Sequence, residues 1–311
     1  MSGIELSVDL GGIQMKNPVT VASGTFGYGK EYAELIDITR LGAVTVKGIR
    51  LKEWDGNALP RHVEVPGGMV NAIGLQGPGV KGFVENYMPF LVEKGVPVIV
   101  NIWGTSVDEY AEVAARLSDI QGVSGLELNI SCPNVKAGGL AFGTDPRSVA
   151  ELVKHVRSAT RLPIMPKLAP NVPDIKPFVQ AAQDNGANAI ALINTIPAMV
   201  IDIESRMPVL SNKVGGLSGS AIHPVAVKLV WEAAQVATVP ILAMGGIMAA
   251  EQAIEFMIAG ATAVAVGTAN FIDPSASLSV ISGIASYLKR HEMKSSSELT
   301  GSIVLKSEMQ T

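Results

Sequence analysis

Eight short apolar runs, rich in Val, Ile and Leu, recur along the chain and alternate with amphipathic segments. Continuous apolar runs of this kind are typical of strands that are buried on both faces of a parallel sheet. Parallel strands need long crossover connections, which the helix-like segments between the runs would supply. The runs are residues 18–22, 43–47, 97–101, 125–129, 163–167, 187–193, 239–244 and 262–266.

The segments between the runs also carry helix signals. Asp145-Pro146 and His223-Pro224 would place proline in a first helical turn, and Gly186 and Gly260 stand where helix C-caps belong. Eight strand–helix units in about 250 residues predict an α/β fold of the (β/α)8 TIM-barrel type. A doubly wound open sheet is the alternative, but no Gly-x-Gly-x-x-Gly motif follows the first strand, which counts against a dinucleotide-binding fold. The clearest helical segments are residues 107–117, 148–159, 175–185, 224–237 and 249–259.

Three segments of the chain lie outside these strand–helix units. We expect all of them to belong to one domain over residues 1–311, in which the barrel covers about residues 17–290. Residues 4–16 alternate around Gly11-Gly12 and predict an N-terminal β-hairpin that closes the barrel bottom. Residues 50–80 are long and rich in Gly and Pro, which indicates a functional segment. Residues 294–311 form a polar C-terminal tail without clear periodicity.

Composition excludes several classes of protein. Charged residues make up only 17%, below the roughly 25% of an average soluble domain, so we expect a large core or a surface buried against partners. The net charge of −4 offers no basic field for nucleic acid. The N-terminus does not resemble a signal peptide, and no run reaches the roughly 18 apolar residues of a membrane span. With one cysteine, these features predict a cytoplasmic protein.

Polar residues and glycines follow or end most of the apolar runs, at what would be the carboxyl edge of the barrel. Active sites of TIM barrels are built at this edge. A lysine that is buried there without a partner is costly, so Lys47 and Lys167 predict an anionic ligand or paired carboxylates. The alternative, that each lysine extends to solvent, is less favoured for two at once. The residues are Ser23, Lys47, Asn101, Asn129, Lys167, Asn194, Thr195, Gly245, Gly246, Gly267 and Thr268.

The glycines after the last two runs indicate a phosphate site. Loops after strands seven and eight commonly bind phosphate in such barrels, and glycine lets the backbone approach the oxygens closely. We expect residues 216–220 to complete this cradle.

Cys132, the only cysteine, lies in Asn129-Ile130-Ser131-Cys132-Pro133-Asn134, just beyond the fourth predicted strand. A lone cysteine is often a small buried hydrophobe, but this setting favours a reactive thiol, because an unperturbed pKa of roughly 8.5 needs little adjustment for base chemistry. We expect no metal site, because the four histidines lack ligand spacing. They are His62, His155, His223 and His291.

Over about residues 4–290, the chain resembles the class 1 dihydroorotate dehydrogenases, which are FMN enzymes of pyrimidine synthesis. The segment Ser23-Gly24-Thr25-Phe26-Gly27-Tyr28-Gly29 is similar to the NAD-linked branch. Further matches are Val46-Lys47-Gly48, Asn71-Ala72-Ile73-Gly74-Leu75-Gln76, Asn129-Ile130-Ser131-Cys132-Pro133-Asn134 and Gly245-Gly246-Ile247.

The resemblance implies roles for individual residues. Cys132 would be the base that removes a proton from C5 of dihydroorotate, while FMN accepts the hydride from C6. One FMN per chain would be held by Ser23, Lys47, Gly48, Asn101, Asn129, Lys167, Ile193, Gly219, Gly245, Gly246, Gly267 and Thr268. The substrate would be held by Lys47, Asn71, Ala72, Ile73, Gly74, Leu75, Asn129, Asn134, Asn194 and Thr195.

The resemblance also implies partners. In the NAD-linked branch a second subunit carries FAD and a 2Fe-2S cluster, and this chain, with one cysteine, cannot hold such a cluster alone. We expect a homodimer core within a heterotetramer. A fumarate-linked homodimer, a flavin subunit for dihydropyrimidine reduction and a catalytically silent barrel are the alternatives. Two departures from the family pattern lie close to the site: Gly77, where Asn is usual, and Trp103, where a small residue is usual.

Overall fold

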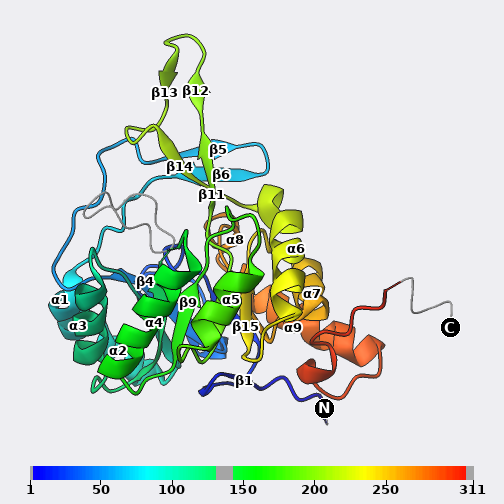
Figure 1. Cartoon of the computed structure of the whole chain (residues 1–311). Helices are drawn as coiled ribbons and strands as arrows, with labels where there is room; N and C mark the ends of the chain where they lie inside the picture. The colour runs from blue at the N-terminus through cyan, green and yellow to red at the C-terminus, as the bar shows by residue number, and fades with distance from the viewer. Residues whose placement is uncertain (1–2, 131–142, 306–311) are drawn as a thin grey trace.

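The computed structural model describes residues 3–130 and 143–305, and its centre is a sheet of eight parallel strands that curves into a nearly closed barrel (Figure 1). The two end strands, β3 and β4, meet where the Gly42 N–H donates to the Val19 carbonyl at 2.9 Å. All eight predicted strands are present, so the predicted (β/α)8 barrel is confirmed. The sheet order is β3 (Val19–Val21), β16 (Ala263–Val266), β15 (Ile241–Met244), β10 (Ile190–Leu192), β9 (Ile164–Lys167), β8 (Val123–Asn129), β7 (Val98–Ile102) and β4 (Val44–Ile49).

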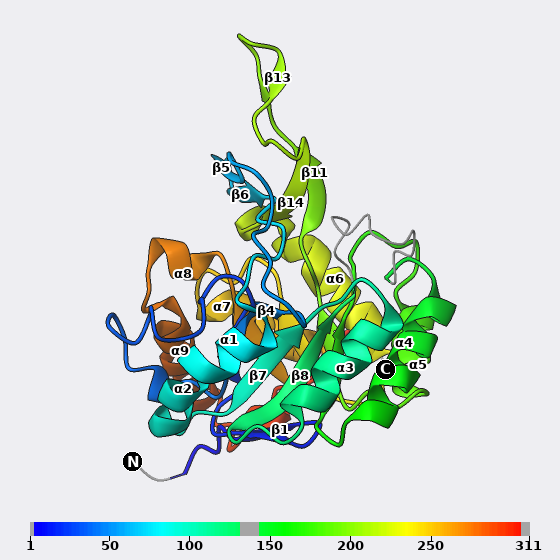
Figure 2. The ribbon, with the colours of Figure 1, turned by 90° about the vertical axis from the view of Figure 1, so that its left-hand side faces the viewer.

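Helices cover the outside of the barrel (Figure 2). The Asp145 side chain accepts a hydrogen bond from the Arg147 N–H and caps α4, and Gly260 ends α7 with a φ of 125°. No helix among the described residues is both long enough and apolar enough to cross a bilayer. The α-helices are α1 (Gly79–Asn86), α2 (Met88–Lys94), α3 (Val107–Leu117), α4 (Pro146–Ala159), α5 (Lys176–Gln183), α6 (His223–Ala234), α7 (Ala250–Ala259), α8 (Ala269–Ile272) and α9 (Ala276–Arg290), with 3₁₀ turns η1 (Ile38–Arg40), η2 (Ser220–Ile222) and η3 (Ser296–Glu298).

The predicted N-terminal hairpin is confirmed as β1 (Val8–Leu10) and β2 (Ile13–Met15), which pair antiparallel. Its side chains pack with apolar residues inside the barrel and close the end opposite the site. A Cβ on Gly125 would lie 2.4 Å from Cδ1 of Ile13. Glycine at this position in β8 therefore lets the hairpin approach the barrel wall.

A second, antiparallel sheet lies over the carboxyl ends of the barrel strands (Figure 1). Its order is β11 (Ile196–Met199), β14 (Val214–Ser218), β6 (Gly68–Asn71) and β5 (His62–Val65). Residues 50–80 and 196–218 were not predicted as strands. Although β5 and β6 form a local hairpin, the sheet is completed by the pairing of β6 with β14, which lies far away in the sequence. The hairpin of β12 (Ile201–Asp202) and β13 (Met207–Pro208) projects beyond this sheet.

The polar tail begins at Lys294, and its first residues are packed against the N-terminal segment. Its sequence, which lacks clear periodicity, did not indicate this packing. The Glu5 N–H donates to the Lys294 carbonyl at 2.8 Å, and the Ser296 N–H donates to the Glu5 carbonyl at 2.9 Å. Ser296 and Leu299 are fully buried. This part of the chain therefore pairs with the N-terminal segment, an interaction that local periodicity does not reveal.

Candidate active site

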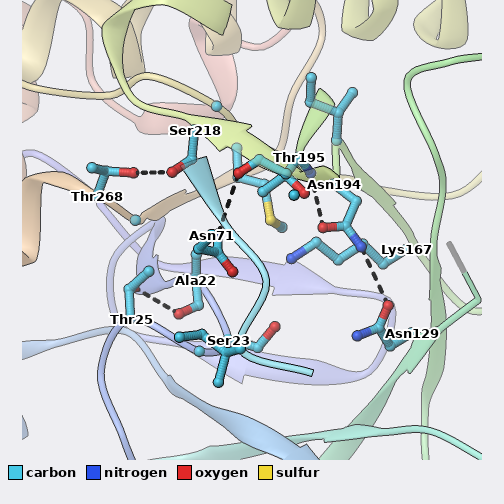
Figure 3. A pocket seen from close by; sticks show the side chains of 18 of the residues that line it. Ala22, Ser23, Thr25, Asn71, Asn129, Lys167, Asn194, Thr195, Ser218 and Thr268 are labelled. Carbon is cyan, nitrogen blue, oxygen red and sulfur yellow. Dashed lines mark hydrogen bonds between the residues drawn. The ribbon is translucent and has the colours of Figure 1, made fainter. Parts of the chain in front are cut away.

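A pocket of about 640 Å³ opens at the carboxyl ends of the barrel strands, beneath the second sheet. Residues from nearly every barrel strand line it, as the strand-end pattern predicts. Figure 3 places Lys167, Asn129 and Asn194 together on one side and Ser218 and Thr268 on the other. The predicted site residues that line this pocket are Ser23, Lys47, Gly48, Asn71, Ile73, Gly74, Leu75, Asn101, Asn129, Lys167, Ile193, Asn194, Thr195, Gly219, Gly245, Gly246, Gly267 and Thr268.

Among the described residues, one predicted site residue, Ala72, does not line this pocket. Ala72 is buried with Val70 and Leu210 on the face of the second sheet that points away from the pocket, so its side chain is not part of the lining. Alternation along the extended segment turns it away from its neighbours Asn71 and Ile73, which do line the pocket. Cys132 and Asn134 lie outside the described residues.

Lys167 and Asn129 are neighbours because β8 and β9 pair in parallel with these two residues in register. Both are nearly buried, with exposed fractions of 5% and 8%. The Asn194 amide nitrogen donates to the Asn129 side-chain oxygen at 3.3 Å. This wall thus offers one cation, which donates hydrogen bonds, and two amides. The amides can both donate to and accept from a ring with alternating N–H and C=O groups.

Lys47 supplies a second cation, and its electrostatic setting is unfavourable. Burial, followed by the nearby positive charge of Arg61, lowers the pKa of the Lys47 ammonium group, and Glu31 opposes this shift. Arg61 also lines the pocket. The negative charge of an anionic ligand beside Lys47 would favour the ammonium form and offset this shift, so this part of the pocket is suited to a carboxylate or phosphate.

The opposite wall is a glycine cradle. Gly219, Gly245 and Gly246 have φ values of 105°, 135° and 70°. A Cβ on Gly246 would lie 2.8 Å from the Gly219 carbonyl oxygen, so only glycine lets these loops approach so closely. Beside them, the Thr268 hydroxyl donates to the Ser218 hydroxyl at 2.8 Å. Close backbone loops next to two hydroxyls form a suitable surface for a phosphate group.

The two departures from the family pattern are in contact with the same turn of chain. A Cβ on Gly77 would lie 2.9 Å from the Gly48 carbonyl oxygen and 3.0 Å from the Tyr28 hydroxyl. A Cβ on Gly48 would lie 3.2 Å from Cδ1 of Trp103. Trp103 is itself buried, and its ring packs under the Arg50 guanidinium at 4.8 Å. Gly77 and Trp103 therefore both lie against the backbone at Gly48, and neither of them lines the pocket.

Two sets of residues at this site were missed in the sequence. Arg61 lines the pocket from just before the second sheet, and His62, Glu64 and Met69 line it from the sheet itself. Only the length and the Gly and Pro content of residues 50–80 pointed to them. Glu127 is fully buried on β8 and lies next to the lining residues. The available signal for Glu127 was a carboxylate inside an otherwise apolar strand. Among the described residues, no group of three His, Cys, Asp or Glu side chains is arranged to hold a metal.

Comparison with known proteins agrees with this geometry. The family model described as dihydroorotate dehydrogenase matches residues 5–288. The chain is 50% identical over 300 residues to a protein of Geotalea uraniireducens, covering 96% of this chain and 98% of the relative. It is 51% identical over 298 residues to a protein of Desulforudis audaxviator, covering 96% and 97%. Both relatives are named dihydroorotate dehydrogenase B (NAD(+)), catalytic subunit. The chain belongs to the dihydroorotate dehydrogenase family.

Proposed function

We propose that this chain oxidises dihydroorotate to orotate in pyrimidine biosynthesis, as the FMN-containing catalytic subunit of an NAD-linked enzyme. The observation that supports it best is the pocket itself, which combines two lysines, a wall of asparagines and a glycine cradle. The relatives that match almost the whole chain are named for this activity, for NAD(+) and for a catalytic subunit.

The residues of the pocket fit FMN. The cradle of Gly219, Gly245 and Gly246 would hold the phosphate, with the hydroxyls of Thr268 and Ser218 beside it. The remaining predicted flavin contacts also line the pocket. The Asn101 side-chain oxygen is buried without a hydrogen-bond partner among the described residues, so it is available to a donor in the pocket. When bound, FMN supplies the acceptor for the hydride that leaves C6 of the substrate.

The protein's own groups would hold the substrate and take its proton. Lys47 would pair with the substrate carboxylate, and Asn71, Asn129 and Asn194 would hydrogen-bond the ring, with Thr195 beside them. The second sheet covers the pocket and would exclude water from it. The proton from C5 would go to the thiolate of Cys132, a role that rests on the sequence motif.

The electron acceptor is tested with the isolated chain. We expect it to reduce an artificial dye with dihydroorotate but to reduce NAD poorly, because a partner subunit with FAD and a 2Fe-2S cluster, in a heterotetramer, would carry electrons to NAD. The measurement compares dye, NAD and fumarate as acceptors. Failure to reduce any dye contradicts the proposed function. Rapid NAD reduction by the chain alone contradicts the partner, and rapid fumarate reduction supports the fumarate-linked alternative.

Lys47 predicts a pH dependence of substrate binding. The carboxylate of orotate favours the charged lysine, so affinity should be full below the pKa of Lys47 and fall as pH rises through it. Because that pKa is lowered in the protein, the fall should begin at a lower pH than an ordinary lysine would give. Orotate titrations at several pH values measure it, with Lys47→Arg as the control that stays charged. An identical pH dependence in both proteins would rule out Lys47 as the cause.

A further inference from the structure

Glu127 is a buried carboxylate to which the mechanism above gives no role. It lies on β8, is completely buried and is not itself part of the pocket lining. Its Oε1 accepts hydrogen bonds from the Ser23 hydroxyl at 2.9 Å and from the Asn101 amide nitrogen at 2.6 Å. The Lys167 ammonium nitrogen lies 3.8 Å from the same oxygen. One oxygen atom therefore contacts three side chains that line the pocket.

These three side chains come from different strands. Ser23 follows β3, Asn101 lies on β7 and Lys167 ends β9. Asn101 and Glu127 are partners in the parallel ladder between β7 and β8, so backbone pairing fixes how they meet. Both Ser23 and Asn101 donate to Glu127, which leaves the serine oxygen and the asparagine carbonyl free to face other groups. Glu127 thus determines which atoms these two side chains present to the pocket.

The charge of Glu127 also bears on Lys167. A buried ion is costly unless it is paired and hydrogen-bonded. The Oε1 atom of Glu127 is both, whereas its Oε2 atom is buried without a hydrogen-bond partner among the described residues. With Lys167 protonated, the pair has a net charge of zero on this side of the pocket. Without the carboxylate, the same wall would carry one positive charge, at close range and in a setting with little solvent screening.

We infer that Glu127 is a positioning residue, which orients Ser23, Asn101 and Lys167 toward the flavin and offsets the charge of Lys167. This inference rests on the proposed FMN site. It predicts that Glu127 limits how strongly the pocket prefers a reduced, more negative flavin over an oxidised one. A residue that only stabilises the barrel would change the free energy of unfolding and leave this preference unchanged.

The test is Glu127→Gln, which keeps the shape and a hydrogen-bond acceptor but removes the charge. FMN binding to the apoprotein, and the midpoint potential of the bound flavin, are measured for both proteins. We expect the ratio of dissociation constants for oxidised and reduced FMN to rise about tenfold, equivalent to roughly 30 mV for a two-electron couple. The control is Glu112→Gln, which removes the same charge from an exposed pair with Arg116 on α3 and should leave the ratio unchanged.

The outcomes separate the inference from the function on which it rests. A wild-type chain that binds no FMN contradicts the proposed function. A wild-type chain that binds FMN, with an unchanged ratio in Glu127→Gln, overturns the inference alone. If Glu127→Gln does not fold, Glu127→Asp decides the matter: it keeps the charge and shortens the reach, so the ratio should stay near wild type while the rate of flavin reduction falls. A ratio that rises about tenfold in Glu127→Asp, although the charge is kept, would also overturn the inference.

Discussion

Lys167→Ala should lower the rate of flavin reduction by dihydroorotate on the order of 10²-fold, the scale seen when one preorganised stabilising group is removed from an active site. Lys167 is buried at the end of β9, lines the pocket and lies 3.8 Å from the Glu127 carboxylate. Its loss removes the cation that would favour added negative charge on the flavin. It also leaves Glu127 without this counter-charge, and breaking a buried pair in this way costs about 3–5 kcal/mol of stability.

The matched control for this variant is Lys154→Ala. Lys154 lies on α4 with its side chain exposed, so the change removes the same side chain from a surface helix. Such surface substitutions usually alter stability by less than about 0.5 kcal/mol. Stopped-flow reduction of the bound flavin and thermal unfolding are measured for both. Equal effects of the two substitutions would contradict the argument that strand-end lysines build the site.

The barrel and one side of its site were predictable because both follow from local patterns and a general rule of topology. Buried parallel strands are apolar without interruption, so each could be located by itself. Once eight strands close into a barrel, the residues that end them, such as Lys47 and Asn129, are brought to one edge. Lys167 and Asn129 are direct neighbours in the ladder, although 38 positions separate them in the sequence.

The second sheet was not predictable by the same reasoning. β6 pairs with β5 nearby but also with β14, where Asn71 lies opposite Gly216. Pairing over such a distance leaves little trace in either strand alone, because register is determined by partners that a single segment does not reveal. His62 and Arg61 consequently reach the pocket from a region where length and Gly and Pro content were the available signals.

Glu127 was missed for a different reason. A carboxylate within an apolar strand is a local conflict, and such conflicts are expected at functional sites. The sequence does not say which groups would offset its charge. Ser23, Asn101 and Lys167 become its partners only when their strands are placed side by side. The four residues thus form one polar cluster that joins different strands of the barrel.

Cys132→Ser should cut the reduction of bound flavin by dihydroorotate on the order of 10²-fold or more, within the roughly 10²–10⁴-fold contribution of a general base. This prediction rests on the sequence motif around Cys132, which lies outside the described residues. Ile130, two positions before Cys132, lines the pocket. A serine hydroxyl is a far weaker base near neutral pH. FMN should remain bound, because Cys132 is not among the predicted flavin contacts.

The pH dependence of this step distinguishes loss of the base from a general defect. In the wild-type chain the rate should rise with pH as the thiolate forms, around the unperturbed cysteine pKa of roughly 8.5. The Ser variant should lack that rise. Reduction of its flavin by a chemical reductant should be normal, which shows that the cofactor is intact. Rapid-mixing absorbance measurements across this pH range give both profiles. Near-normal reduction by dihydroorotate in the Ser variant would show that another group takes the proton, because no other cysteine exists in the chain to replace the thiolate.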